Sequence, residues 1–213
     1  MAMPDDTGTC WEDEVAEIHR LVVGALGTNV YALRCKATGA AVLIDGAGPP
    51  EPVLELCRRV GAGRVLQTHG HHDHIGAIPA LRAAGHHVSV AAADAAMLPG
   101  WDGVVADGDA VEVGRLQLSA IATPGHTPGS MSYALVEPGR AGSPVVFVGD
   151  TLFPGGPGAT RWPYSDFGAI IGSIDRQLFA RFDDDTVVLP GHGRPTTIGA
   201  ERPHLAEWAA RGW

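Results

Sequence analysis

The sequence has few cysteines, few basic residues and no long apolar run, and each shortage excludes a class of protein. Its three cysteines, Cys10, Cys35 and Cys57, form no Cys-x-x-Cys pair, which argues against a disulfide framework and against a sulfur-bound zinc site. No apolar run approaches the ~18 residues that a membrane-spanning helix needs. The first residues contain neither the basic segment nor the apolar segment of a secretory signal. We therefore expect a cytoplasmic protein with reduced thiols and no membrane partner.

Basic side chains are outnumbered by acidic ones. The chain has 15 lysines and arginines against 24 acidic residues, a formal net charge of −9, and no basic cluster. Because a nucleic-acid-binding surface needs basic residues to neutralise phosphates, we expect no nucleic-acid partner and a small-molecule substrate instead. The 213 residues, 45% of them hydrophobic, fit one domain with a sizeable core over residues 1–213. No feature of the sequence indicates an oligomeric state.

Histidine, in contrast, is concentrated in one short segment. Residues 69–74 read His-Gly-His-His-Asp-His and follow a short β-type run at residues 65–68. If the chain stays extended past that run, alternation places two imidazoles and a carboxylate on one side. These are His69, His71 and Asp73, with His74 next in line. Such residues are metal ligands, so we interpret the segment as a metal site rather than as solvated loop histidines.

Three further potential ligands lie in turns bounded by glycine or proline. They are His126 in Thr-Pro-Gly-His, Asp150 in Gly-Asp-Thr and His192 in Pro-Gly-His-Gly. Each follows an apolar, strand-like run, at residues 118–123, 145–149 and 186–189. Strands that each end in a tight turn with one potential ligand predict a site at one edge of a sheet, where rigid elements aim loop side chains inward.

The remaining pattern predicts an α/β chain. We expect strands over residues 15–23, 29–35, 40–44, 65–68, 87–91, 111–113, 116–121, 131–136, 145–148 and 186–189. We expect helices over residues 50–60, 75–84, 94–98, 167–179 and 200–211, the second with Asp73 at its N-cap. Residues 137–143 and 153–164 are expected to form loops. Strands in two runs, with helices between and after them, fit two packed sheets with helices outside.

Together these residues resemble the metallo-β-lactamase-fold hydrolases, and most of all their glyoxalase II (hydroxyacylglutathione hydrolase) branch. The resemblance rests on four motifs in order: Thr-His-x-His-x-Asp-His at residues 68–74, Thr-Pro-Gly-His-Thr-Pro-Gly-Ser at 123–130, Gly-Asp-Thr-Leu-Phe at 149–153 and Pro-Gly-His-Gly at 190–193. It implies a four-layer αββα sandwich with the metal site at one edge of the sheets.

The resemblance also implies a ligand set for two divalent metal ions. It assigns His69, His71 and His126 to one metal and Asp73, His74 and His192 to the other, with Asp150 bridging both. Seven candidate ligands exceed the about four that one tetrahedral zinc needs. Mixed imidazole and carboxylate ligands suit Zn²⁺ and also accept iron or manganese.

The implied reaction is hydrolysis by a metal-bound hydroxide. A zinc-bound water has a pKa near 7, and the neighbouring Asp73 orients that water and takes up its proton. The expected substrate is a thioester, with an ester or lactone as alternatives. Asp45, at a strand end, corresponds to an aspartate that often accepts a hydrogen bond from a ligand histidine in the family. A turn-forming role for Asp45 remains the alternative.

The loop after Asp150 contains Arg161, Trp162 and Tyr164. An arginine beside aromatic residues suits a substrate wall with an anion-binding group, and packing of the loop onto the sheet is the alternative.

The sequence departs from glyoxalase II in two places. The Gly-x-Gly-Arg segment of the family is replaced by residues 156–160, with Arg161 displaced, and only residues 194–213 follow the last motif. We therefore expect no additional C-terminal helical domain, and glutathione as the thiol stays open. A persulfide dioxygenase with one iron, held by His69, His126 and Asp150, is an alternative. So are a lactonase and a non-catalytic metal-binding relative.

Overall fold

The computed structural model describes residues 8–135 and 144–212, so the loop expected at residues 137–143 lies outside the described residues. The described part of the chain forms two large sheets. The first has seven strands in chain order: β1 (Gly8–Glu12), β2 (Ala16–Val23), β3 (Thr28–Cys35), β4 (Ala41–Ile44), β5 (Ala62–Leu66), β6 (His87–Val90) and β7 (Gly103–Val104). Strands β1 to β4 pair antiparallel, and β4 to β7 pair parallel.

The second sheet has six strands in the order β15-β14-β11-β10-β9-β8. They are β8 (Ala110–Val113), β9 (Leu116–Ala122), β10 (Met131–Leu135), β11 (Val145–Gly149), β14 (Val187–Pro190) and β15 (Thr196–Thr197). A small hairpin, β12 (Leu152–Phe153) and β13 (Gly156–Pro157), lies in the segment expected to be a loop. The strands that the sequence pattern did not indicate are short or at an edge: β1, β7, β12, β13 and β15.

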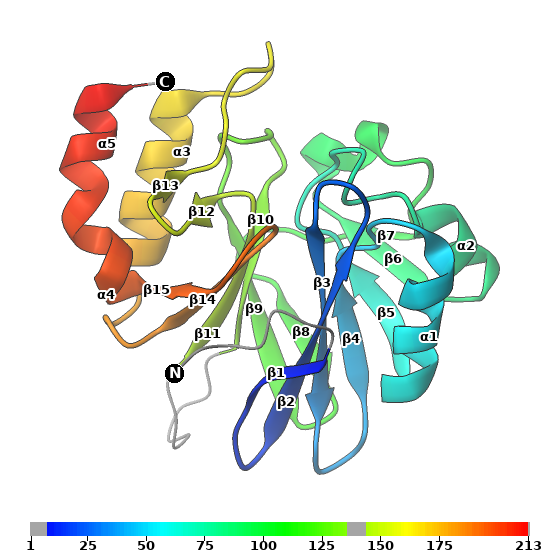
Figure 1. Cartoon of the computed structure of the whole chain (residues 1–213). Coiled ribbons are helices and arrows are strands. Elements are labelled where there is room, and N and C mark those ends of the chain that lie inside the picture. Colours follow the sequence, from blue (N-terminus) through cyan, green and yellow to red (C-terminus); the bar gives the residue numbers. More distant parts are fainter. Residues whose placement is uncertain (1–7, 136–143, 213) are drawn as a thin grey trace.

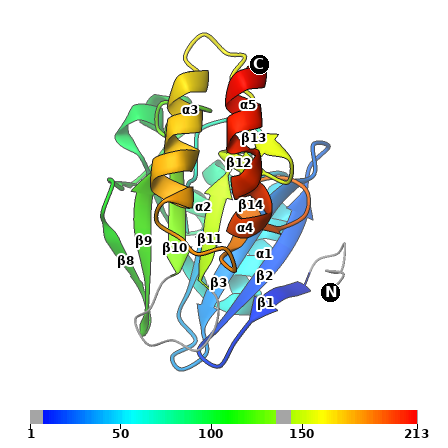
Figure 2. The same ribbon diagram turned by 90° about the vertical axis from the view of Figure 1, so that its left-hand side faces the viewer.

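Helices cover the outer faces of both sheets (Figures 1 and 2). Helices α1 (Pro50–Val60) and α2 (Ile78–Ala83) lie on the first sheet, and a 3₁₀ turn, η1 (Ala92–Met97), follows β6. The second sheet is covered by α3 (Phe167–Ser173) with its π-helical continuation η2 (Ile174–Phe179), and by α4 (Ile198–Glu201), η3 (Arg202–His204) and α5 (Leu205–Arg211). The order helix, sheet, sheet, helix confirms the predicted αββα sandwich.

Three apolar cores hold the four layers together. Side chains such as Leu33, Leu118, Tyr133 and Phe147 are fully buried between the sheets. A second core lies between the first sheet and α1 and α2. A third lies between the second sheet and the helices α3, η2 and α5. Burial of apolar surface at roughly 25 cal/mol per Å² is the main force that joins these layers.

Several element boundaries differ from the predictions for local reasons. Helix α2 begins at Ile78 with Ala77 as its N-cap, so Asp73 is not its cap. The expected helix over residues 167–179 changes to π-helix at Ile174, and Ala180 N donates to Asp175 O at 2.9 Å. Pro203, which lacks a backbone N–H, divides the expected C-terminal helix. In the described part of the chain, no helix has the length and apolar character needed to span a membrane.

The strand directions place the sequence motifs together. Strands β4 and β5 are parallel, so the segments after them leave the same edge of the first sheet. In the second sheet, β10 is antiparallel to both β9 and β11, and β11 is parallel to β14. The segments that follow β9, β11 and β14 therefore meet at one edge as well. These are the segments that carry the candidate ligands.

Candidate metal centre

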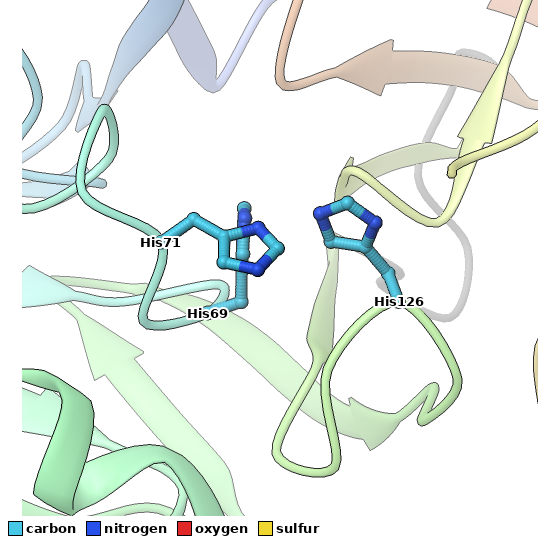
Figure 3. A group of neighbouring side chains, drawn as sticks. All are labelled: His69, His71 and His126. Carbon is cyan, nitrogen blue, oxygen red and sulfur yellow. The ribbon is translucent and has the colours of Figure 1, made fainter. Parts of the chain in front are cut away.

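The first ligand cluster consists of His69, His71 and His126. Their rings come from two loops and point toward a common space (Figure 3), with one potential ligand atom from each residue within 4.8 Å of the others. His69 and His71 follow β5, and His126 lies between β9 and β10. All three side chains are buried.

The second cluster consists of Asp73, His74 and His192, again with ligand atoms within 4.8 Å of one another. His74 N donates to His71 O at 2.9 Å, so the chain turns after His71. This turn corrects the expectation of an extended chain with His69, His71 and Asp73 on one side. It directs Asp73 and His74 toward His192 instead.

Asp150 lies between the two clusters. Its carboxylate oxygens are 3.4 Å from His74 Nε2, 3.5 Å from His126 Nε2 and 3.5 Å from His192 Nε2. His69, His74 and Asp150 form a third overlapping group of potential ligands. This position between the clusters would allow its carboxylate to contact two metals.

The outer ring nitrogens of the histidines are held by hydrogen bonds. His126 Nδ1 donates to Ala159 O at 2.7 Å, and His192 Nδ1 donates to Leu26 O at 3.1 Å. His69 Nδ1 lies 3.0 Å from Thr68 Oγ1. Such contacts set the ring direction of each histidine and turn its Nε2 toward the other candidate ligands.

Asp45 lies behind the second cluster. Its Oδ2 is 2.8 Å from His74 Nδ1, and its two oxygens accept from Thr68 N at 2.7 Å and Thr68 Oγ1 at 2.8 Å. The backbone of Asp45 has a positive φ of 66°, a conformation that aspartate tolerates better than most residues. Asp45 thus contacts His74, a candidate ligand, as the resemblance implied, and it also stands in a turn with positive φ.

The two clusters differ in charge. Burial lowers the pKa of His69, and it lowers the pKa of His71 to about 4, so both rings are neutral at neutral pH, as metal binding requires. Burial alone would lower the pKa of His74 as well, but the carboxylates of Asp150 and Asp45 raise it well above the usual range. Asp150 is the counterpart: burial opposes its ionisation, yet the charge of His74 holds its pKa well below normal.

Buried polar atoms without partners test whether a metal pair fits these residues. Among the described residues, His69 Nε2, His126 Nε2 and Asp150 Oδ1 are buried and form no hydrogen bond. Buried polar atoms are normally hydrogen-bonded, so three such atoms among the candidate ligands need an explanation. Imidazole and carboxylate groups around two adjacent points are ligands that divalent zinc, iron or manganese accept. The residues therefore fit a binuclear metal site.

A cavity of about 680 Å³ opens above the clusters, a volume typical of small-molecule sites. Arg161, Trp162 and Tyr164 all line it. The ring of Trp162 lies 4.3 Å from that of His71, and Tyr164 Oη is 3.0 Å from His71 Nε2. The Arg161 guanidinium lies 5.0 Å from the Trp162 ring. His72 also lines the cavity, but its side chain is 88% exposed and lies outside both clusters.

Four buried polar residues around the clusters were not identified from the sequence. Thr28 Oγ1 donates to Asp73 Oδ2 at 3.2 Å, and Gln67 Nε2 donates to His74 O at 2.8 Å. Asn29 contacts the loop of His192, and Asp94 contacts the loops of the first cluster. In the sequence, Thr28 and Asn29 could have been noticed as two polar residues at the start of a largely apolar strand.

Comparison with known proteins identifies the family. Residues 23–192 match the family model of the Metallo-beta-lactamase superfamily. Since this match spans most of the chain, the protein belongs to that superfamily, as the sequence motifs predicted.

Individual relatives are similar at a moderate level. An uncharacterized protein of Mycobacterium tuberculosis is 34% identical over 206 residues, which cover 84% of this chain and 92% of that protein. The hydroxyacylglutathione hydrolase GloC of Haemophilus influenzae is 30% identical over 184 residues, which cover 76% of this chain and 84% of that protein. The crystal structure of TTHA1623 in a di-iron-bound form has a TM-score of 0.73 and 29% identity, covering 86% of this chain and 96% of the other.

Proposed function

We propose that this protein is a binuclear metal-dependent hydrolase of the glyoxalase II type that cleaves a small acyl thioester. One observation carries the proposal: seven ligand side chains form two adjacent clusters, with Asp150 between them, at the base of a cavity. Zn²⁺ is the metal we expect. Iron is the main alternative, because the similar TTHA1623 structure is in a di-iron form.

In the proposed reaction, the metals and the protein side chains have different roles. Two divalent ions held by these residues would supply a bound water with a pKa near 7 and a positive charge to polarise a carbonyl. Asp73 orients the attacking water and accepts its proton. Its Oδ2 lies 3.1 Å from His192 Nε2 and accepts from Thr28 Oγ1 at 3.2 Å, so its direction is held from two sides. Burial opposes ionisation of Asp73, but the hydrogen bond from His192 and the charge of His74 keep its pKa below normal.

The cavity walls support a substrate with an anionic group. Arg161 forms no ion pair with the described residues, and it is the cationic side chain that lines the cavity in the described part of the chain. A guanidinium binds a carboxylate through paired hydrogen bonds. The stacked rings of Trp162 and Tyr164, which are 5° from parallel, provide an apolar surface for the rest of the substrate. The similarity to a hydroxyacylglutathione hydrolase supports a thioester as the reacting group.

The first experiment measures metal content per chain in protein purified without added metal, together with turnover of S-D-lactoylglutathione. Two ions per chain with rapid turnover would support the proposal. Two ions without turnover of this or other thioesters would reject the thioesterase and leave ester and lactone substrates to test. A single iron, with oxygen uptake on glutathione persulfide, would replace the proposal by the dioxygenase.

A further inference from the structure

Asp94 is a fully buried carboxylate outside both ligand clusters. It lies in η1, its exposed fraction is 0%, and it does not line the cavity above the clusters. No lysine or arginine pairs with it among the described residues. A buried carboxylate is costly unless hydrogen bonds compensate for the lost water. The hydrogen-bond donors to Asp94 therefore indicate its structural role.

All three hydrogen-bond donors to Asp94 belong to loops that carry ligands of the first cluster. Oδ2 accepts from Gly70 N at 2.9 Å and from Thr127 Oγ1 at 2.7 Å, and Oδ1 accepts from Gly129 N at 2.7 Å. Gly70 lies between His69 and His71, and Thr127 directly follows His126. One carboxylate thus joins the two loops whose histidines form the cluster in Figure 3.

Glycine in both loops allows this close approach. A Cβ at Gly129 would lie 2.6 Å from Asp94 Oδ1, and a Cβ at Gly70 would lie 2.5 Å from Met97 Cβ. Both separations are shorter than van der Waals contact, so any other residue would push the loop away from η1. The backbone of each loop is therefore adapted to bind η1, independently of the histidines that it presents.

We propose that Asp94 is a positioning residue for the cluster of His69, His71 and His126. It sets the separation of their two loops without contacting metal or substrate. The inference rests on the metal pair of the proposed function, because it concerns the affinity of that pair. Hydrogen bonds to a charged acceptor are roughly twice as strong as neutral ones. Residues that orient metal ligands in this way typically change metal affinity about 10- to 100-fold when they are replaced.

Asn29 provides a control because its side chain donates to the loop of His192 and to neither loop of the first cluster. Its Nδ2 donates to Pro190 O at 2.9 Å and to Gly193 O at 3.0 Å, and its backbone N donates to Gly191 O at 2.7 Å. Like Asp94, it is a buried polar residue, with 1% exposure. A general loss of stability would affect variants of both residues alike, whereas positioning separates their effects by cluster.

The test is a Zn²⁺ titration of chelator-treated wild type, Asp94→Asn and Asn29→Ala. Asn keeps the size of Asp94 but places an NH₂ group against N–H or O–H donors. We expect Asp94→Asn to weaken one of two zinc-binding steps about 10- to 100-fold and Asn29→Ala to weaken the other. Zinc affinities of Asp94→Asn equal to wild type would overturn the inference, and so would equal losses at the same steps in both variants. A wild type that binds neither Zn²⁺ nor Fe²⁺ would instead reject the proposed metal centre itself.

Two further measurements separate positioning from misfolding. In the metal-free protein, Asp94→Asn should speed amide hydrogen exchange at Gly70 and Gly129 but leave the core amide of Phe147 unchanged. If Asp94→Asn does not melt cooperatively, Thr127→Val removes one of the three hydrogen bonds and Thr127→Ser retains it. The Val variant should then weaken the same zinc step, with recovery in the Ser variant. Unchanged zinc binding in Thr127→Val would contradict the role of Asp94.

Discussion

Asp73 has two neighbours, His192 and Thr28, that hold its carboxylate. His192 Nε2 lies 3.1 Å away and Thr28 Oγ1 lies 3.2 Å away, while the side chain itself remains 16% exposed to the cavity. This partial exposure distinguishes Asp73 from Asp45 and Asp94, which are buried and have hydrogen-bonded partners on all sides. A carboxylate that is held in place and also faces the cavity is suited to handle a proton.

We predict that Asp73→Ala, refilled with metal, loses about 10²- to 10⁴-fold in kcat, the usual contribution of a positioned acid–base group. The thioester assay should be accompanied by metal analysis, because Asp73 is also a candidate ligand. Thr28→Val is the control: it removes one hydrogen bond to the carboxylate and should cost far less turnover. Wild-type kinetics in a metal-replete Asp73→Ala protein would exclude Asp73 from the reaction.

Arg161 is exposed and stacked on Trp162, so its removal should change substrate binding and leave the fold intact. For a thioester with a carboxylate, we predict that Arg161→Gln raises KM about tenfold at similar kcat, as expected for one hydrogen bond to a charged group. Arg161→Lys keeps the charge but loses the paired geometry, and should fall between the two. An equal KM rise with an uncharged thioester would show that Arg161 packs the loop instead.

At the scale of elements, the pattern of the sequence predicted the long strands and the ligand turns. Alternating or continuous apolar residues indicated β2, β3, β9, β10 and β11, and the motif residues lie directly after strand ends, as expected. Boundaries differed where a local turn hydrogen bond or a proline decides the geometry. The turn from His71 to His74 and the break at Pro203 are examples.

Some features could not be predicted from the sequence pattern because their stability comes from partners elsewhere in the chain. Strand β15 has only two residues and is a strand because it pairs with β14. The hydrogen bonds of Asp94 join residues 24, 33 and 35 positions away in the chain. Local periodicity contains no information on such contacts, so Asp94 appeared only as a helix-start residue. Asn29 was missed for the same reason, since its partners are at Pro190 and Gly193.

The junction of α2 with β6 allows a prediction about acid stability. Arg82 on α2 forms a two-pronged ion pair with Asp102, with contacts of 2.6 to 3.1 Å, and Asp102 also accepts from Val88 N at 3.0 Å. The hydrogen bonds from Arg82 lower the Asp102 pKa from 3.8 to about 2. A lowered pKa in the folded state stabilises the fold above the unfolded pKa, and the effect disappears as pH falls through about 2.

We therefore predict that Asp102→Asn melts a few degrees below wild type at pH 6, and that the difference narrows between pH 4 and pH 2. The effect should be small, because the two side chains are 37% and 29% exposed and water screens surface ion pairs. Thermal melts at four or five pH values would measure it. A gap that is constant over this pH range would show that ionisation of Asp102 contributes nothing to stability.

For the molecule as a whole, the candidate metal centre joins the two sheets. His69, His71, Asp73 and His74 leave the first sheet, whereas His126, Asp150 and His192 leave the second. Each cluster contains ligands from both sheets. A metal bound at either cluster would therefore add a link between the two halves of the sandwich, which also meet through the apolar core and through hydrogen bonds such as those of Asp94 and Asn29.

Metal removal should consequently lower the stability of the entire fold. A ligand that binds only the folded state adds about 2.7 kcal/mol at 100 times its Kd, so two sites add about 5 kcal/mol. For a chain of this size, about 1 kcal/mol shifts Tm by about 2–4 °C, which predicts a loss of about 10–20 °C on chelation. Calorimetry before and after chelation, followed by Zn²⁺ addition, measures the loss and its recovery. The variant His126→Ala keeps only the second cluster complete. Its Tm should therefore fall on chelation by about half as much as that of wild type. A wild type whose metal is removed without any fall in Tm would contradict a centre that joins the two sheets.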